Sequence, residues 1–505
     1  MIDEGRAVAL VRGVAANPGA GAGVLVRLLP PEAREAREVL QRRPLPAEFV
    51  ALVLRDGDRS DRSVIARNVH LTGEQARQVV RDRDDLVAAR LVSAPGGRGT
   101  VRAVQLPDDV VDLVLLGTAE RDRAMLLPQE IVAELGAAGH LEAHLRRLVD
   151  HPEPALRAFV CGYWTRLGTG QRAALLADPD PEVRAAAHRE AHPDLAEQGR
   201  RWAANSSRDR ITQLWASPLP DDLLDTLITT RTHPELLAGN PHLPPPAVRR
   251  LAADPDPLVR RTVAQRPDLD AELLDVLAAD PDEGVRRRAA LLPAPRTRGR
   301  AEAVFRVLGT PVAHPSAVRP EPVDDPGLDW YRACAAAPDP VLRRTAATCP
   351  RLDPPTAARL AADPDRDVRL LLALHHPAAP PALLLEAYAQ LPEQRDRLRL
   401  HPAFPRRGLP AALARDPDPA VRELAASDQD FAGDPEALRA DPDPRVRRAA
   451  AANPRLPAGR AADLLADPGA GLEQVEGAAA HPGLTADRLH ALLDEAGVPR
   501  ARTRP

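Results

Sequence analysis

A motif built on Asp-Pro pairs recurs through most of this 505-residue chain, and it is clearest in residues 441–465. Asp441-Pro442-Asp443-Pro444 precedes a run of Val, Arg and Ala that ends at Asn453-Pro454, and a Leu-containing run follows Pro457. Asp is a good N-cap, Pro suits the first helical turn, and a residue before Pro is pushed out of the helical region. We therefore expect Asp441 to cap one short helix that ends before Pro454, and a second short helix to start after Pro457.

The copies of this motif are almost evenly spaced. Asp254 to Asp280 is 26 residues, Asp416 to Asp441 is 25, and Asp441 to Asp467 is 26. Two short helices with one apolar face each are too small to form a core alone, so neighbouring units must stack. The sequence therefore predicts an all-α fold, an α-solenoid of two-helix repeats about 26 residues long.

An arginine stands six residues after the first Asp position of most repeats. These arginines are Arg184, Arg260, Arg286, Arg343, Arg369, Arg422 and Arg447. Such a ladder of guanidinium groups is able to follow a phosphate backbone. The alternative, which we favour, is that each Arg pairs with a helix-initiating Asp of its own or a neighbouring repeat. A second Arg follows in some repeats and is freer to meet a partner, so the candidate partner-binding residues are Arg261, Arg287, Arg344 and Arg448.

The matching segments, best seen at Ala253–Arg260 and Ala452–Pro457, read A-D-P-D-P-x-V-R and A-x-N-P-x-L-P. They resemble the leucine-rich repeat variant family and, more distantly, HEAT-like repeats. The resemblance implies a right-handed superhelix of paired helices without strands. It implies no activity, because that family is defined by its scaffold. One precedent in the family carries an iron–sulfur module fed by clustered cysteines, and Cys161, Cys334 and Cys349 are scattered instead.

Composition limits the classes of partner. All 68 basic residues are Arg, the net charge is −4, and aromatic residues make up only 2% of the chain. There is no global attraction to nucleic acid or to an anionic membrane, and few rings are available for base stacking. The three cysteines have no metal or disulfide spacing and are expected to be small buried side chains. The start of the sequence lacks the shape of a signal peptide and no run is long enough to span a bilayer, so we expect a cytoplasmic protein.

Regularity of the motif divides the chain into segments. They are degenerate N-terminal repeats (1–92), an irregular helical segment (93–149), a repeat array (150–293), an irregular loop or degenerate repeat (294–330), a second array (331–498) and a tail (499–505). Residues 60–106 also allow a winged-helix interpretation, with Gly96–Gly99 as the wing. In that case Gln75, Arg77, Gln78 and Arg98 are candidate nucleic-acid contacts. The repeat register passes through the same residues, which favours one more repeat.

The search for catalytic chemistry is negative. His188 and His192 lie four apart on an expected helix, but a third metal ligand is missing from the pattern. His192 stands before a proline, a place filled elsewhere by Asn17, Asn240, Arg266, Cys349, His376, Asn453 and His481. Such a place suits a polar side chain that reaches the free carbonyls of a helix end. We predict no cofactor, no small-molecule substrate and no enzyme activity. The predicted function is a scaffold for another protein, with nucleic-acid binding as the alternative.

Overall fold

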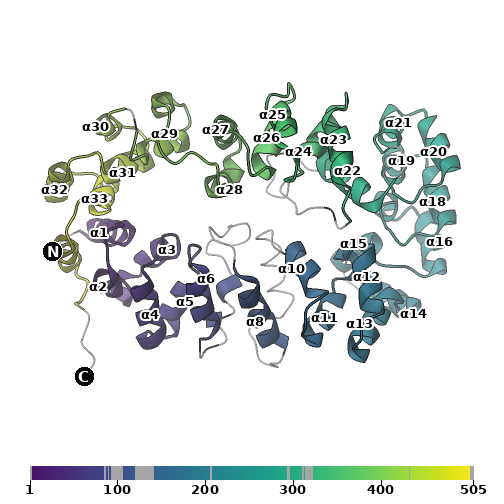
Figure 1. Ribbon diagram of the computed structural model, residues 1–505, viewed down its shortest axis with the longest axis horizontal. Coiled ribbons are helices and arrows are strands. Elements are labelled where there is room, and N and C mark those ends of the chain that lie inside the picture. The colour runs from purple at the N-terminus through teal and green to yellow at the C-terminus, as the bar shows by residue number, and fades with distance from the viewer. Residues whose placement is uncertain are drawn as a thin grey trace. The chain divides into compact units, whose positions relative to one another are not determined.

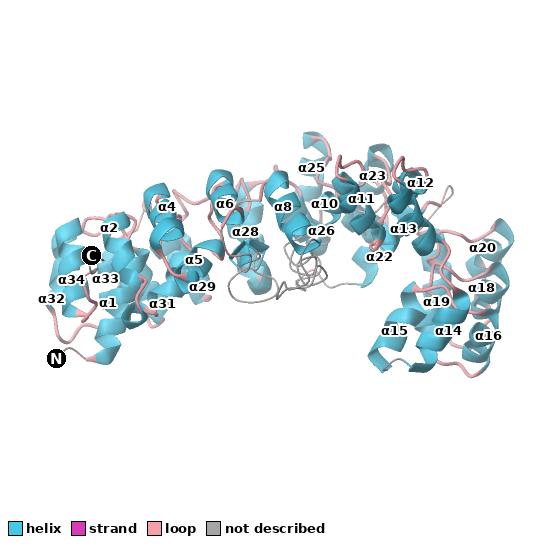
Figure 2. Cartoon of the chain, turned by 90° about the horizontal axis from the view of Figure 1, so that it is seen from below, coloured by secondary structure: helices cyan, strands magenta, loops and turns pink. Residues whose placement is uncertain are grey.

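A computed structural model of the chain describes residues 3–82, 84, 87, 88, 90–92, 106–119, 141–204, 207–292, 296–309, 312, 322, 324–431 and 433–500. Across these residues the regular elements are α-helices and short 3-10 helices, without a strand (Figure 2). The predicted all-α class is therefore confirmed. In the same residues, no helix is both long and apolar enough to cross a membrane. The 26-residue repeat length and the right-handed superhelix stay predictions.

The helices, which Figure 1 labels, fall into two compact units. Unit 1 joins residues 1–139 to residues 380–505, and unit 2 is residues 140–379. Unit 2 is therefore inserted, in sequence, between the two parts of unit 1. The second array predicted from the sequence, residues 331–498, is divided between the two units.

The first part of unit 1 contains α1 (Glu4–Ala16), α2 (Ala22–Leu25), η1 (Val26–Leu28), η2 (Pro31–Ala33), α3 (Ala36–Gln41), α4 (Ala47–Asp56), α5 (Arg59–Ala66), α6 (Gly73–Val80), η3 (Arg90–Val92) and α8 (Asp108–Ala119). The second part contains α27 (Pro381–Gln390), η6 (Pro392–Gln394), α28 (Arg395–Leu400), η7 (Ala411–Arg415), α29 (Pro419–Ala426), α30 (Pro435–Leu438), α31 (Pro444–Ala452), α32 (Ala458–Ala466), α33 (Leu472–Ala479) and α34 (Ala486–Glu495).

Unit 2 begins with α10 (Leu141–Leu148), α11 (Pro154–Cys161), η4 (Trp164–Arg166), α12 (Thr169–Leu176), α13 (Pro181–Ala191), α14 (Leu195–Ala204), α15 (Ser207–Ala216), α16 (Asp221–Thr229) and α17 (Pro234–Leu237). It continues with α18 (Pro245–Ala252), α19 (Pro257–Ala264), α20 (Ala271–Ala278), α21 (Glu283–Ala290), α22 (Arg298–Gly309), α23 (Leu328–Ala335), α24 (Pro340–Ala347), α25 (Pro354–Ala361) and α26 (Arg366–His375). Helix α22 covers part of residues 294–330, the segment expected to be a loop or degenerate repeat, and it packs against α24.

The Asp-Pro motif starts its helix two residues later than predicted. Asp443, not Asp441, is the N-cap of α31: its carboxylate accepts from the N–H of Arg445, and Pro444 is the first helical residue. The physical reason lies in Pro444, which pushes the preceding Asp443 into an extended conformation and so prevents the helix from beginning earlier. Asp441 accepts instead from the backbone N–H of Asp443 at 2.9 Å. The predicted end is confirmed, because Asn453 is the C-cap.

Stacking of equivalent helices builds the core of each unit. In unit 2, α15 packs on α17, α17 on α19 and α19 on α21, while α18 lies between α16 and α20. The buried side chains there are Leu, Val and Ala, including Leu214, Val259, Val263 and Leu277, which is what the low aromatic content predicts. Close packing of such short side chains suits helix-on-helix stacking, and it fixes where the polar ends of the helices meet.

Candidate interaction surface

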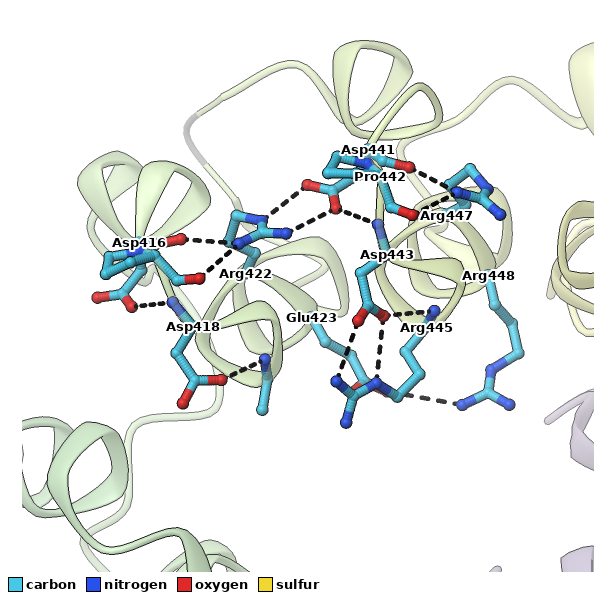
Figure 3. Close-up of polar contacts among 12 residues, drawn as sticks. Asp416, Asp418, Arg422, Glu423, Asp441, Pro442, Asp443, Arg445, Arg447 and Arg448 are labelled. Carbon is cyan, nitrogen blue, oxygen red and sulfur yellow. Dashed lines mark hydrogen bonds and ion pairs between the residues drawn. The ribbon is translucent and has the colours of Figure 1, made fainter.

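Arg422, six residues after Asp416, connects two neighbouring repeats (Figure 3). It donates from Nε and Nη2 to the two carboxylate oxygens of Asp441, at 2.8 and 2.9 Å. Its Nη1 donates to the backbone carbonyls of Asp416 and Pro417, in its own repeat. The hydrogen bond from Arg422 lowers the pKa of the Asp441 carboxyl and raises that of the guanidinium. One side chain thus ties two helix entries together.

The same arrangement recurs in both units. Bidentate or near-bidentate pairs join Arg62 to Asp82, Arg157 to Asp178, Arg260 to Asp280 and Arg343 to Asp363. In the Arg260 pair the two side chains are only 13% and 7% exposed. The predicted pairing with Asp is confirmed for Arg260, Arg343 and Arg422, although each Asp partner stands two residues before the N-cap of the next helix. Arg184, Arg286 and Arg369 donate to backbone carbonyls of their own repeat, and Arg447 pairs with Glu473. The buried Arg–Asp pairs are structural groups and are not presented to a phosphate backbone.

The four candidate partner-binding arginines are also ion-paired. Arg261 makes a bidentate pair with Asp282 at 2.8 and 2.7 Å, and Arg344 pairs in the same manner with Asp365. Arg287 reaches Asp339 at 3.2 Å, and Arg448 lies 3.3 Å from Glu476. Their side chains are still 30–53% exposed. They are therefore less free to meet a partner than the sequence suggested, because each is paired with a carboxylate that neutralises its charge.

The four candidate partner-binding arginines do not all lie in the same unit. Arg261, Arg287 and Arg344 lie in unit 2, whereas Arg448 lies in unit 1. In unit 1, Arg448 lies between Glu423 of α29 and Glu476 of α33, and Arg445 pairs with Asp443 of its own repeat. Opposite charges in direct contact largely cancel at a distance, so these paired arginines attract a polyanion only weakly.

The segment with the winged-helix interpretation stacks as a repeat over its described part. Helix α6 packs against α4 and α8, and Gln75 is buried, with its side-chain amide donating to the carbonyl of Leu45. Gln75 also forms the capping box of α6 with Thr72. Gln75 therefore faces the neighbouring repeat and is not available to a DNA groove. The sequence signal that identifies this role is the spacing of Thr72 and Gln75, which is that of a capping box.

The other nucleic-acid candidates have mixed placements. Arg77 pairs with Asp109 at 2.8 Å, which raises the pKa of its guanidinium, and Gln78 is exposed. Arg98 and the predicted wing at Gly96–Gly99 lie outside the described residues.

The place before proline is where adjacent repeats are stitched together. Asn453 donates from Nδ2 to the carbonyls of Ala426 and Asp428, which belong to the preceding repeat, at 2.8 and 2.9 Å. Asn240 and Arg266 reach two carbonyls of the preceding repeat in the same way, as does Asn68, which precedes Val69 instead of a proline; His376 and His481 reach one each. The prediction of a polar side chain that serves free carbonyls is confirmed, with the addition that the carbonyls belong to the neighbouring repeat.

The histidine pair and the cysteines form no recognisable metal site or catalytic site in the described residues. The rings of His188 and His192 are stacked with centroids 6.0 Å apart. Among the described residues, no three His, Cys, Asp or Glu side chains are placed to hold a metal. Cys161, Cys334 and Cys349 are buried, as predicted. Burial raises the pKa of the Cys161 thiol to about 11 and that of Cys334 to about 12, so both are protonated near neutral pH.

Sequence reasoning missed two surface features. Helix α15 in unit 2 exposes Ile211 and Trp215, four residues apart and therefore on one face, at 43% and 54%. Trp215 lies against Gly239 at the end of α17. In unit 1, a groove of about 650 Å³ is lined by Asp434, Glu436, Arg455 and Arg460, and its charges are mixed. Neither has a motif in the sequence, because both depend on which helix faces stacking leaves uncovered.

Comparison with known proteins relates one repeat of the chain to a known family. No curated protein matches the chain significantly. The family model described as leucine rich repeat variant matches residues 257–282, which start with α19 and end at the N-cap of α21. This span contains one complete Arg260–Asp280 connection and the Arg261–Asp282 pair. Residues 257–282 thus match one leucine-rich repeat variant unit, the family that the sequence of this chain resembles.

Proposed function

We propose that this helical repeat protein is a non-enzymatic scaffold that binds another protein, and that α15 of unit 2 supplies an anchor for it. The observation that carries the proposal is the exposed apolar pair Ile211 and Trp215. Trp is the side chain most often found at the energetic centre of protein interfaces, because it offers a large contact area at low entropic cost. A half-exposed Trp beside an exposed Ile on one helix face suits a shallow apolar anchor.

The paired charges of the repeat array in unit 2 favour a protein over a nucleic acid as the partner. The arginines of the array are already paired with carboxylates, so binding a polyanion would require breaking those pairs. A protein surface with its own mixture of charges can meet such a neutralised face without that cost. Nucleic-acid binding through the Arg faces or residues 60–106 remains the second candidate, and it is supported only by the number of arginines.

Affinity capture from native lysate with the full chain tests the first candidate when Trp215→Ala is compared with Val276→Ala. Val276 is 58% exposed on α20 in the same unit, so its truncation removes a similar kind of surface group at another place. We expect specific proteins to be recovered by the wild type and by Val276→Ala, and to be reduced at least tenfold with Trp215→Ala, since truncating a hot-spot Trp costs about 2 kcal/mol or more. Equal recovery by all three proteins would argue against the α15 anchor.

Electrophoretic mobility with duplex DNA tests the second candidate. A shift that weakens steeply with salt, and that is lost when Arg77 and Arg98 are both changed to Ala, would favour nucleic-acid binding. We expect no sequence-dependent shift at physiological salt.

A further inference from the structure

In unit 1 the stack of helices continues from the C-terminal part of the chain into the N-terminal part. Helix α29 packs on α31, α31 on α33, α33 on α1, α1 on α3, and α3 on α5. Figure 1 draws α1, in purple, beside the yellow-green α33. The second helices follow the same order, since α34 contacts α2, and α2 contacts α4. The N-terminal repeat therefore occupies the place that the next repeat after α33 and α34 would take.

The polar stitch at this junction matches the stitch between consecutive repeats. Asn17 donates from Nδ2 to the carbonyls of Ala479 and His481 at 3.0 and 2.8 Å. Its Oδ1 accepts from the N–H of Gly19 at 2.8 Å, as the Oδ1 of Asn453 accepts from Arg455. Asn17 is fully buried. The junction therefore has the hydrogen-bond pattern of an ordinary repeat interface, although its two sides lie at opposite ends of the sequence.

The helices at the junction approach as closely as those inside the stack. A Cβ on Gly13 of α1 would lie 2.3 Å from the carbonyl oxygen of Glu476 on α33. A Cβ on Gly477 of α33 would lie 2.2 Å from the carbonyl oxygen of Arg448 on α31. Each glycine stands four residues before the stitching residue of its repeat. Glycine is needed at both positions because only the missing side chain allows backbone-to-backbone contact at this separation.

Burial and charge close the same junction. One hydrophobic cluster contains Leu10 and Val14 from α1 together with Val475 from α33 and Leu489 from α34. Arg27, whose side chain is 3% exposed, donates to the carboxylate of Asp494 at 2.6 Å and to the carbonyl of Val498 at 2.7 Å. Leaving a buried guanidinium without its partners is strongly destabilising, so the contacts of Arg27 stabilise this junction.

From this geometry we infer that the edge formed by α33 and α34 is a docking surface for the N-terminal repeat, and that a second copy of this chain can supply that repeat. The two sides of the junction belong to segments that are separated in sequence by all of unit 2, so an N-terminal repeat from another copy presents the same groups to the edge. Exchange of an identical element between copies forms a dimer without any new type of contact. The occupant in either case is the segment from α1 to η1.

Refolding the full chain from denaturant over a series of protein concentrations, followed by light-scattering mass measurement, tests this inference. We expect the chain mass of 54.3 kDa after dilute refolding and a growing fraction at twice that mass after concentrated refolding. Co-refolding a tagged and an untagged chain should give mixed dimers. Gly13→Ala should make amide exchange in α33 and α34 about tenfold faster in the dimer as well as in the monomer, because the added Cβ opposes docking from either copy.

Matched variants separate docking from general destabilisation. A Cβ on Gly23 meets nothing within 4 Å, so Gly23→Ala should behave as the wild type. If Gly13→Ala fails to fold, Asn17→Ala is compared with Asn453→Ala, which removes the equivalent stitch between α29 and α31. Only Asn17→Ala should accelerate amide exchange in α33 and α34 of the dimer. The inference is overturned if no species of double mass forms, or if neither Gly13→Ala nor Asn17→Ala accelerates amide exchange in α33 and α34 of the dimer.

Discussion

Replacing Asp280 tests whether the Arg–Asp connection between repeats is a structural element of the array. In the wild type, Arg260 donates to Asp280 at 2.7 and 2.9 Å, and Asp280 also accepts from the N–H of Asp282 at 2.8 Å. Asp280→Ala leaves a guanidinium that is 13% exposed without its carboxylate. Breaking a buried ion pair from one side costs about 3–5 kcal/mol. Arg260 keeps its bonds to the carbonyls of Asp254 and Pro255, so we expect the low end, about 3 kcal/mol.

Amide hydrogen exchange in α19, α20 and α21 is the appropriate assay, because a chain with two units is not expected to unfold in one step. A loss of about 3 kcal/mol corresponds to exchange roughly 150-fold faster in these helices, with α31 of unit 1 as an internal reference. Asp280→Asn keeps an acceptor for both neighbours and should cost less. Replacing Arg260 by Met together with Asp280 by Leu should recover most of the loss, because the buried charge is gone from both sides.

Arg249→Ala is the matched control for this experiment. Arg249 of α18 pairs with Asp270 across the preceding repeat interface, but both side chains are 50% exposed, so the pair contributes at most about 1 kcal/mol. If Asp280→Ala accelerates exchange no more than Arg249→Ala does, the buried pair is not what connects these repeats, and the argument is refuted.

Three further predictions concern other parts of the array. Asn240→Ala leaves the carbonyls of Leu214 and Ser217 without their donor and should lower local stability by about 1–3 kcal/mol, measured by amide hydrogen exchange in α15 and α17. Asn240→Asp should lower it further, because a carboxylate cannot donate to these carbonyls. The pKa values of Asp280, Asp441 and Asp282 are lowered in the folded protein, that of Asp282 to about 2, so these carboxylates stabilise the fold above the usual Asp pKa near 3.8. This stabilisation is lost as the pH falls through the folded pKa values, so the melting temperature should drop from about pH 4 downward. Asp441→Asn should make that drop smaller. Cys334, buried and with a thiol pKa of about 12, should resist alkylation at pH 8 in native protein and react after unfolding; prompt native labelling would contradict its placement.

The local chemistry of the repeat could be predicted from the sequence because it is set by neighbours in the motif. The Arg–Asp pairing, the helix end at Asn453 and the apolar helical stack all follow from spacing and residue type. The helix start was misplaced by two residues, since two Asp-Pro pairs compete for the cap and only the second can precede the first turn. Here the restriction that Pro444 places on Asp443 decides the outcome.

The candidate surface could not be predicted in the same way. The freedom assigned to Arg261 and Arg344 depended on where the next repeat places Asp282 and Asp365, which is a property of stacking. The hydrogen bond from Asn17 to the carbonyl of Ala479 is still harder to predict from the sequence, because no local rule relates residues at the two ends of a chain. The signal was present in the pattern, since Asn17 occupies a place that elsewhere bonds to the repeat before it.

Insertion of unit 2 between the parts of unit 1 sets an order of events during synthesis. The segment containing α1 leaves the ribosome about 450 residues before α33, which at 5–20 residues per second is a delay of roughly 20 to 90 s. During that time Leu10 and Val14 have no partner from the C-terminal part, although they are fully buried in the finished fold. On a polysome, several nascent chains carry this uncovered helix face close together. The interval before the C-terminal repeats emerge is therefore when the chain depends most on chaperones, and when pairing between copies has its best opportunity.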